Sequence, residues 1–463
     1  MIGCVYIVND KSFYLITIEN IENNRITIMN KIKITLFIFI VALGFSACEK
    51  SDVPRVKNPI EIVSPTPDAP ITKVTLSEEQ KGYANSGNAF AIKSLKSLYE
   101  KEKKGIIYSP LSLQYALAIT ANGASGETAS EIIGTLGYGE DQQALNKYCN
   151  LLLNQLPALD KDVELKLTDA VIVNEEFSVQ DAFRNTAEKM YYAPVEYVNA
   201  SNPKLVVDRI NEWAYRSTNG FIFPFLQESD IKRDFVAAIL NALYFKAKWS
   251  GNRDTPMFNS ELTEKSQPFY LDGGGESKVD YMVASRRFRY GKVGNNGIVE
   301  LPYADGKFAM YIILPDIKGG NGLSQLLSSL TSEKFSEAMS SMSEDAIVNL
   351  HLPKFELENK YELTDMLKAL GISRAFDNNA QFDKMLYHSD IHGFKIGSVI
   401  QKARISVAEW GTEAGAATAV MIERTAAPGQ PKMVKFFADH PFVYTIVEKS
   451  SGVMLFAGVY DGK

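Results

Sequence analysis

The sequence has few cysteines, and they lie far apart. Only three occur in 463 residues, Cys4, Cys48 and Cys149, too few for a disulfide framework. Cys149 lies in a short apolar run, so we expect it to be a half-buried free thiol on a helix. Because 46% of the residues are hydrophobic, the chain can derive its stability from a large core instead.

Basic residues are not in excess either. The formal net charge is -6 at pH 7, and no long cluster of lysine and arginine interrupts the acidic balance. Domains that bind nucleic acids usually carry a basic patch or stripe. We therefore expect no nucleic-acid partner.

Residues that many enzymes need for catalysis are scarce. The four histidines are scattered over separate elements, which gives little support to a Ser-His-Asp hydrolase, and we find neither a glycine-rich phosphate loop nor a nucleophile elbow. His388 and His392 have helical metal-ligand spacing, but Asp390 and Gly393 indicate a loop, and no third ligand is apparent. We expect no metal site, no cofactor and no enzymatic activity.

What the sequence does contain begins with an export signal. Residues 29–33 are positively charged, residues 34–45 form an apolar run too short for a comfortable membrane span, and Ser46, Ala47 and Cys48 follow. Small residues directly before a cysteine resemble a bacterial lipobox, in which that cysteine is lipidated and becomes the mature N-terminus. We therefore expect an exported protein, anchored through Cys48 to the lipid of a bacterial outer membrane and facing the periplasm or the cell surface.

The N-terminal region divides the chain into three parts. Residues 1–28 have no signal character, so we expect Met29 to be the true start and residues 1–47 to be an upstream extension plus signal peptide. Residues 48–76 carry five prolines among polar residues, which predicts an extended tether. No second linker of that kind follows, so residues 77–463 form one large domain.

Helix signals come early in this domain and strand signals come late. Caps at Ser86, Ser109 and Ser125 predict three helices, the second with proline at its first position and the third ending near Gly137. Apolar runs predict strands over 165–173, 235–245, 308–314, 347–352, 399–408, 442–448 and 454–460. This order favours an α+β fold with at least one large sheet.

Residues 411–427 have the composition of an exposed loop and the alternation of a strand. They are mostly small, with few large apolar anchors, and they precede a turn-rich stretch. As a strand, one face would carry Thr412, Ala414, Ala416, Thr418, Val420 and Ile422, all uncharged. The other face would carry Glu413, Gly415, Ala417, Ala419, Met421 and Glu423, including both acidic residues. An alanine-rich helix is the alternative, which Gly415 and the β-branched residues weaken.

Six segments together resemble one protein family. Gly-Thr-Glu-Ala at 411–414 looks like the hinge of the serpins, and Phe-Ala-Asp-His-Pro-Phe at 437–442 resembles their signature segment. Four further motifs occur in the family's order, at 108–112, 241–249, 300–303 and 350–355. The resemblance covers residues 77–463.

This resemblance implies a fold and a function. The fold would be serpin-like, with helices packed around a large central mixed β-sheet plus smaller sheets, and an exposed reactive-centre loop. The protein would be a monomeric suicide-substrate inhibitor of serine endopeptidases, with cysteine endopeptidases as a second target class, whose cleaved loop inserts into the central sheet. The alternative is a non-inhibitory, serpin-like surface binding protein.

The resemblance also implies roles for individual residues. The hinge comprises Glu409, Gly411, Thr412, Glu413, Ala414, Gly415 and Ala416. Ser109, Ser112, Asn211 and His351 match the family's shutter, the cluster beneath the strands that part. Trp249 and Glu409 match the region where insertion begins. Two departures are Gln401, where histidine is common, and Trp410 beside the hinge, which we expect to anchor it.

The bond that a protease would cut has two assignments. The family's usual spacing from Glu409 gives Thr425 as the specificity residue and Thr425–Ala426 as the cut bond. A loop one residue shorter gives Arg424–Thr425, which we favour. Arg424 would suit a trypsin-like protease, and Thr425 an elastase-like or subtilisin-like one.

Overall fold

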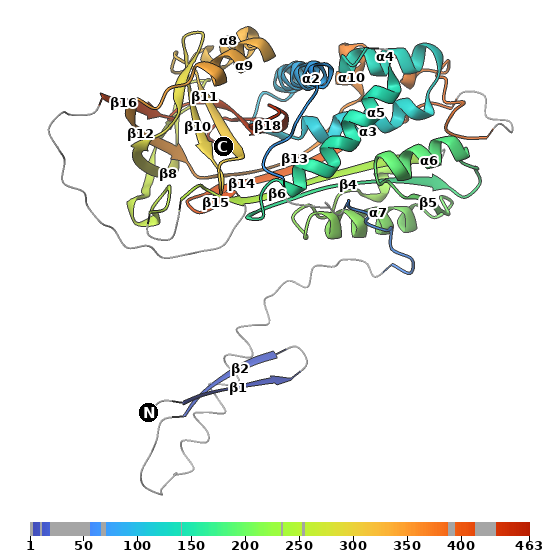
Figure 1. Cartoon of the computed structure of the whole chain (residues 1–463), viewed down its shortest axis with the longest axis horizontal. Helices are drawn as coiled ribbons and strands as arrows, with labels where there is room; N and C mark the ends of the chain where they lie inside the picture. The colour runs from blue at the N-terminus through green and yellow to red at the C-terminus, as the bar shows by residue number, and fades with distance from the viewer. Residues whose placement is uncertain are drawn as a thin grey trace, which may run out of the picture. The chain divides into compact units, whose positions relative to one another are not determined.

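The structure is a computed structural model of the whole chain (Figure 1). It describes residues 3–9, 12–18, 56–65, 71–139, 141–232, 235–251, 255–387, 394–412 and 432–463. Two units are present, Met1–Val53 and Pro54–Lys463. In the first, β1 (Gly3–Asn9) pairs antiparallel with β2 (Ser12–Ile18). Among the helices described, none is long and apolar enough to cross a membrane.

The second unit is built around a six-stranded sheet. Its order is β13 (Phe355–Glu362), β14 (Ile400–Ala408), β15 (Gly411–Thr412), β6 (Ala237–Lys248), β4 (Val163–Asn174) and β5 (Val195–Val198). β4 and β5 are parallel, whereas β15 is antiparallel to both of its neighbours, so the sheet is mixed, as expected. We call it the large sheet.

Two further sheets lie in the described part of this unit. The first has the order β3 (Ile106–Tyr108), β18 (Met454–Tyr460), β17 (Phe442–Glu448), β11 (Phe308–Leu314), β10 (Asn296–Pro302) and β9 (Tyr290–Val293). Its strands β17 and β18 are buried throughout, which explains why their sequences are apolar at nearly every position. The second has the order β16 (Lys432–Phe437), β12 (Ala346–Pro353), β8 (Glu276–Arg287) and β7 (Glu264–Tyr270).

Helices cover both faces of the large sheet. The helices in the described part of this unit are α2 (Glu78–Glu102), α3 (Pro110–Gly123), α4 (Gly126–Leu136), α5 (Gln142–Gln155), α6 (Asp181–Met190), α7 (Pro203–Ser217), α8 (Gly322–Ser329), α9 (Ser332–Ser341) and α10 (Thr364–Leu370). Short 3-10 turns lie at η1 (Leu156–Ala158), η2 (Glu228–Asp230), η3 (Ser260–Leu262) and η4 (Arg374–Phe376). In Figure 1, α7 lies on one face of the large sheet, and α2, α3 and α5 lie on the other. The α+β fold class is confirmed.

Two of the three predicted helix starts are confirmed. Ser109 caps α3, with Pro110 at its first position, and α4 runs from the Ser125 cap to Gly137. The prediction of a start at Ser86 is wrong, because α2 begins at Glu78. There, Ser77 and Gln80 form a capping box, and Ser86 lies inside the helix.

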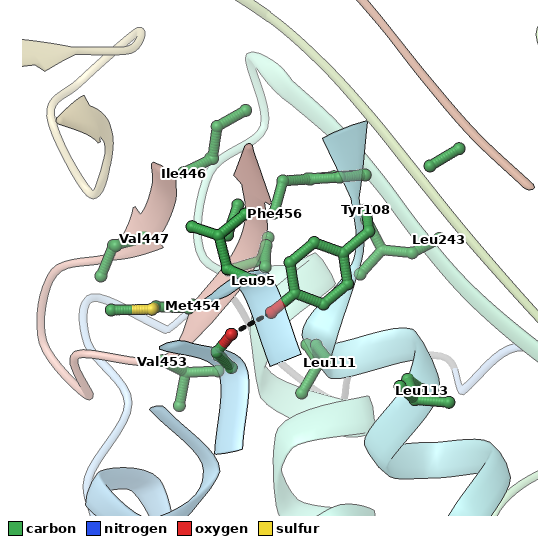
Figure 2. Packing of buried hydrophobic residues seen from close by; sticks show 14 of the residues in the cluster. Leu95, Tyr108, Leu111, Leu113, Leu243, Ile446, Val447, Val453, Met454 and Phe456 are labelled. Atoms are coloured by element: carbon green, nitrogen blue, oxygen red, sulfur yellow. Dashed lines mark hydrogen bonds between the residues drawn. The ribbon is translucent and has the colours of Figure 1, made fainter. Parts of the chain in front are cut away.

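The predicted strands all form, and several contribute to one continuous core. Figure 2 shows Tyr108 of β3 at its centre, surrounded by side chains from α2, α3, β6 and β18. Its hydroxyl donates a hydrogen bond to the carbonyl of Ala91 on α2. The full burial of this ring is compatible with a polar hydroxyl because that hydroxyl has a partner.

Part of the expected tether packs against the folded body. Ile60 is fully buried in a second core cluster together with Val206 and Trp213 of α7. The guanidinium of Arg216 donates to the carbonyl of Ile60, and Val74 is buried in the main core. These described residues of the segment 48–76 therefore pack against the body through isolated apolar side chains, and the assignment of the whole segment as a tether stays a prediction. Cys48 lies outside the described residues.

Candidate functional site

The chain re-enters the large sheet directly after β14. It turns at Glu409 and Trp410, and Gly411 and Thr412 then form β15 between β14 and β6. Gly411 has a φ of +149°, and a Cβ at this position would lie 2.1 Å from the carbonyl oxygen of Ala247 on β6. Only glycine permits this approach. Gly411 and Thr412 of the predicted hinge are thus already part of a strand.

Thr412 occupies a buried aromatic site. Its side chain is enclosed, with 3% of the residue exposed, and its hydroxyl lies 2.6 Å from the hydroxyl of Tyr303. The Tyr303 ring stacks on Trp249 with centroids 4.5 Å apart. Burial raises the pKa of Tyr303, so its hydroxyl keeps its proton. This site has room and a partner for a small uncharged side chain, and no described countercharge at the threonine hydroxyl.

The turn before β15 is held by Trp249 and by Glu409. The Trp249 indole donates to the carbonyl of Ala408 at 2.8 Å, and its backbone N–H donates to the carbonyl of Trp410 at 3.3 Å. The Glu409 carboxylate accepts from the hydroxyl of Thr263 at 2.6 Å and pairs with Lys354 at 3.1 Å. Trp249 and Glu409 therefore hold the same turn, and their role at the start of insertion stays a prediction.

The carboxylate of Glu409 stays charged despite its burial. Burial acts to raise its pKa, but the hydroxyl of Thr263, its own backbone N–H and the ammonium of Lys354 outweigh burial and hold the pKa below its usual range. Because the folded-state pKa is lowered, the stabilisation is present above the unfolded-state pKa and is lost as the pH falls through the folded-state value. The anchor of the hinge is therefore intact at neutral pH.

Beneath the strands, Ser109 and Gln401 join α3 to β14. The N–H of Ser109 donates to Gln401 Oε1 at 3.2 Å, and Gln401 Nε2 donates back to the carbonyl of Ser109 at 2.8 Å. The hydroxyl of Ser109 accepts from the N–H of Ser112 and donates to Leu455 on β18. Ser109, Ser112, Gln401 and Asn241 line one cavity of about 20 Å³. Gln401 thus makes two hydrogen bonds at the position where the family commonly has histidine.

Two of the predicted shutter residues lie elsewhere. Asn211 on α7 holds the segment that leads to β6: its side-chain oxygen accepts from the N–H groups of Phe225 and Leu226 at 2.8 and 2.7 Å. His351 lies on β12 in the four-stranded sheet, 3.3 Å from Glu264 and with its ring against Phe437. The structure does not bring His351 together with Ser109, because strand β12 belongs to another sheet.

Asn241 of β6 belongs to the site and was not singled out from the sequence. Its amide donates to the Asp169 carboxylate on β4 at 2.6 Å, and its own side-chain oxygen is buried without a partner among the described residues. Burial raises the pKa of Asp169 to about 7. The signal was present, because Asn241 opens one of the six motifs, but the motif alone does not show that its side chain lies between two strands.

Below β15, the large sheet has an open position. β6 is paired to β4, and β14 is paired to β13, yet over the described residues no ladder joins β6 directly to β14. Two cavities lie here instead. They are lined by residues 237–243 of β6 on one side, and on the other by residues 400–403 of β14 and the segment 394–399 that precedes it. We call this space the slot. β15 is antiparallel to both β6 and β14. A strand that continued from Thr412 into the slot would therefore also run antiparallel to both of these strands.

Comparison with known proteins identifies the family. A family model described as "Serpin (serine protease inhibitor)" matches residues 85–461. The chain belongs to the serpin family. The family is one of protease inhibitors and not of enzymes.

Individual relatives agree with this assignment. An uncharacterized serpin-like protein of Methanosarcina mazei is 30% identical over 437 residues, which cover 93% of this chain and 97% of that protein. Antichymotrypsin-2 of Bombyx mori is 29% identical over 77% of this serpin and 92% of its own length. The crystal structure of tengpin, a thermophilic serpin, in its native state matches with a TM-score of 0.74 and 27% identity, covering 87% of this chain and 100% of tengpin.

The remaining predicted positions of this serpin lie outside the described residues. They are the rest of the hinge, Glu413, Ala414, Gly415 and Ala416, and the two candidate cut bonds at Arg424, Thr425 and Ala426. Their roles stay predictions. Within the described part of the chain, no group of three or more His, Cys, Asp or Glu side chains could hold a metal ion.

Proposed function

We propose that this serpin inhibits serine endopeptidases as a suicide substrate. The target protease cleaves the segment after Thr412 and forms an acyl-enzyme with it, and the freed segment then enters the slot as a new strand of the large sheet. The observation that carries the proposal is the position of Thr412. It is already paired on both sides, at the top of the slot. Insertion would extend β15 rather than start a strand.

The gain in free energy from insertion is large enough to drive such a reaction. A new strand of about a dozen residues forms ladder hydrogen bonds worth roughly 0.5–1.5 kcal/mol net each. Burying the side chains of Val420, Ile422 and several methyl groups adds a few kcal/mol more. The unreacted protein would then be trapped kinetically, so that its lifetime matters more than its equilibrium stability.

The charge pattern of the segment after Thr412 also supports insertion into the slot. Thr412 occupies an uncharged aromatic site, and the residues that would follow it on the same face are all uncharged. Glu413 and Glu423 fall on the opposite face. A charged side chain on the inward face would have to be buried without a partner, which would slow insertion.

The class of protease depends on the bond that is cut. Cleavage at Arg424–Thr425 would place a guanidinium in the acidic specificity pocket of a trypsin-like protease. Cleavage at Thr425–Ala426 would suit an elastase-like or subtilisin-like protease. The silkworm relative carries the name of an antichymotrypsin, which is consistent with a serine protease as the target.

One experiment tests both the mechanism and the bond. The protein is incubated with trypsin and, separately, with elastase, and the products are separated on a denaturing gel. We expect a covalent complex with at least one of the two proteases, and none when the nucleophilic serine of that protease has been blocked beforehand. Mass spectrometry of the released C-terminal peptide identifies the cut bond. Complete cleavage without any complex would reject the inhibitor and favour the non-inhibitory binding protein.

The place of action is a separate proposal. The signal at 29–47 and the lipobox-like residues before Cys48 support export and lipid anchoring at the outer membrane. We expect cells that express the protein to incorporate labelled palmitate into it, and we expect Cys48→Ala to abolish the label and to release the protein from the membrane fraction. Unlabelled wild-type protein would contradict the anchor.

A further inference from the structure

A large apolar cavity lies at the lower end of the slot. Its volume is about 440 Å³, within the range of roughly 300–1,000 Å³ that is usual for small-molecule sites. Its walls come from α3, from residues 237–241 of β6, from residues 400–402 at the start of β14, and from the segments beside them. It is distinct from the small cavity beneath Ser109, and Asn241 lines both.

The interior of this cavity is lined mainly by hydrocarbon. Leu113 and Leu117 of α3, Ile239 of β6, and the rings of Phe382 and Phe394 all contribute to it. Removing apolar surface from water is favourable in proportion to the area removed. A ligand with a long apolar body would therefore be stabilised by the wall itself.

Among the described residues, the charges that line the cavity are predominantly positive. They are those of Lys232, Lys368, Lys395 and Lys402, against one acidic side chain, Asp230. Lys402 pairs with a glutamate at 2.6 Å, and Asp230 pairs with a lysine outside the lining.

Three of these lysines have no carboxylate partner among the described residues. Lys232 donates to the carbonyl of Gly397 at 2.9 Å, and Lys395 donates to the side chain of Asn378 at 2.8 Å. The ammonium of Lys368 lies 5.7 Å from the centroid of the Phe376 ring. All three residues are exposed to solvent, so an anion can reach them without breaking an ion pair.

We propose that this cavity binds a long-chain fatty acid. The hydrocarbon chain would lie against the leucine and phenylalanine side chains, and the carboxylate would contact Lys232, Lys368 and Lys395. Charge complementarity selects a carboxylate over a neutral lipid of the same length. No covalent step is involved, and binding itself does not depend on the protein being an inhibitor.

The position of the cavity couples binding to the proposed function. Residues 237–241 and 400–402 line the cavity, and they are also the strand segments with which the lower part of an inserted strand would pair. A bound fatty acid and a fully inserted strand therefore exclude each other. This step rests on the proposed suicide-substrate mechanism. A bound fatty acid would reduce the yield of the stable protease complex and increase the fraction of this serpin that is cleaved and released.

The test is a titration of the full chain with palmitate, below its critical micelle concentration, and in parallel with hexadecanol. We expect palmitate to bind more tightly than the alcohol. Replacing Lys232, Lys368 and Lys395 together by glutamine should weaken palmitate binding about tenfold and leave the alcohol unchanged, since each partly exposed ion pair contributes modestly. Ala116→Phe, which fills the cavity from α3, should weaken both ligands.

A matched variant controls for net charge. Lys101, Lys265 and Lys292 are exposed and do not line the cavity, and their triple replacement by glutamine should leave palmitate binding as in the wild type. Equal binding of palmitate to both triple variants and the wild type, or no binding at all, would overturn the proposal. Covalent protease complexes that form equally well with and without bound palmitate would overturn only the coupling between binding and insertion. A complete absence of protease complexes would count against the proposed function alone.

Discussion

Replacing Thr412 by arginine should convert the inhibitor into a substrate. In the structure, the backbone of Thr412 pairs with a strand on each side, and the hydroxyl of its buried side chain lies 2.6 Å from that of Tyr303. A guanidinium at this position would be buried without a partner, at an effective cost of several kcal/mol. Arginine would therefore keep the hinge out of the sheet and remove the start of the new strand.

The magnitude follows from a competition between two rates. In the proposed mechanism, the acyl-enzyme formed by cleavage is either trapped by insertion or hydrolysed by water. A penalty of about 3 kcal/mol on insertion slows that step by roughly a hundredfold, because each 1.4 kcal/mol changes a rate about tenfold. Hydrolysis is unaffected, so most molecules of Thr412→Arg should be cleaved and released.

The assay is a titration of protease with inhibitor, read as residual activity and as covalent complex on a denaturing gel. Two control variants separate charge at the inward face from other effects. Thr412→Val keeps the shape without a charge, and Glu413→Arg places the same charge on the residue predicted to face outward. Both should still form complexes. Wild-type amounts of complex from Thr412→Arg would refute the reasoning.

Three further predictions concern stability. Tyr303→Phe removes the partner of the Thr412 hydroxyl and should lower the free energy of unfolding by about 1 kcal/mol in urea titrations; an unchanged midpoint would show that this hydrogen bond contributes nothing. Burial raises the pKa of Asp169 from 3.8 to about 7, so the folded protein keeps a proton that the unfolded chain loses between these values. Stability should therefore fall as the pH rises from about 4 to 7, by up to about 4 kcal/mol, and Asp169→Asn should flatten this dependence, whereas equal slopes in both proteins would contradict the assignment. Ile60→Ala should cost about 2–4 kcal/mol, measured by urea unfolding, and more than Ile62→Ala, which is only partly buried; equal effects would argue against the packing of this segment.

Local signals in the sequence predicted the helices and strands whose ends are marked by capping or turn residues. The sequence Ser-Pro at 109–110 starts α3 as expected, and apolar runs bounded by turns gave strands β11, β17 and β18 with the observed ends. The hinge glycine was also predictable, because its motif is short and its backbone demands glycine. These features depend on residues that are neighbours in the chain.

Features that depend on distant partners were harder to predict. Asn88 looks like part of a helix cap, yet it lies inside α2, where its side chain donates to the carbonyl of Gly452 at 2.7 Å and accepts from the N–H of Met454. A partner more than 360 residues away satisfies its polar atoms, which no local pattern reveals. His351 was misplaced for the same reason: its motif gives the strand but not the sheet to which the strand belongs.

Along the slot, β6 and β14 are each hydrogen-bonded to a neighbouring strand on one edge only, and the other edge faces the slot. In a strand, successive N–H groups point to opposite neighbours, so alternate amide hydrogens of β6 bond to β4, and the others face β15 at the end of the strand and the slot along the rest of it. Amides that face the slot should exchange rapidly with deuterium, while those that face β4 are protected. An inserted strand would protect both sets. Deuterium uptake by peptides from β6 and β14 therefore distinguishes molecules that have reacted from those that have not, even when no protease remains in the sample.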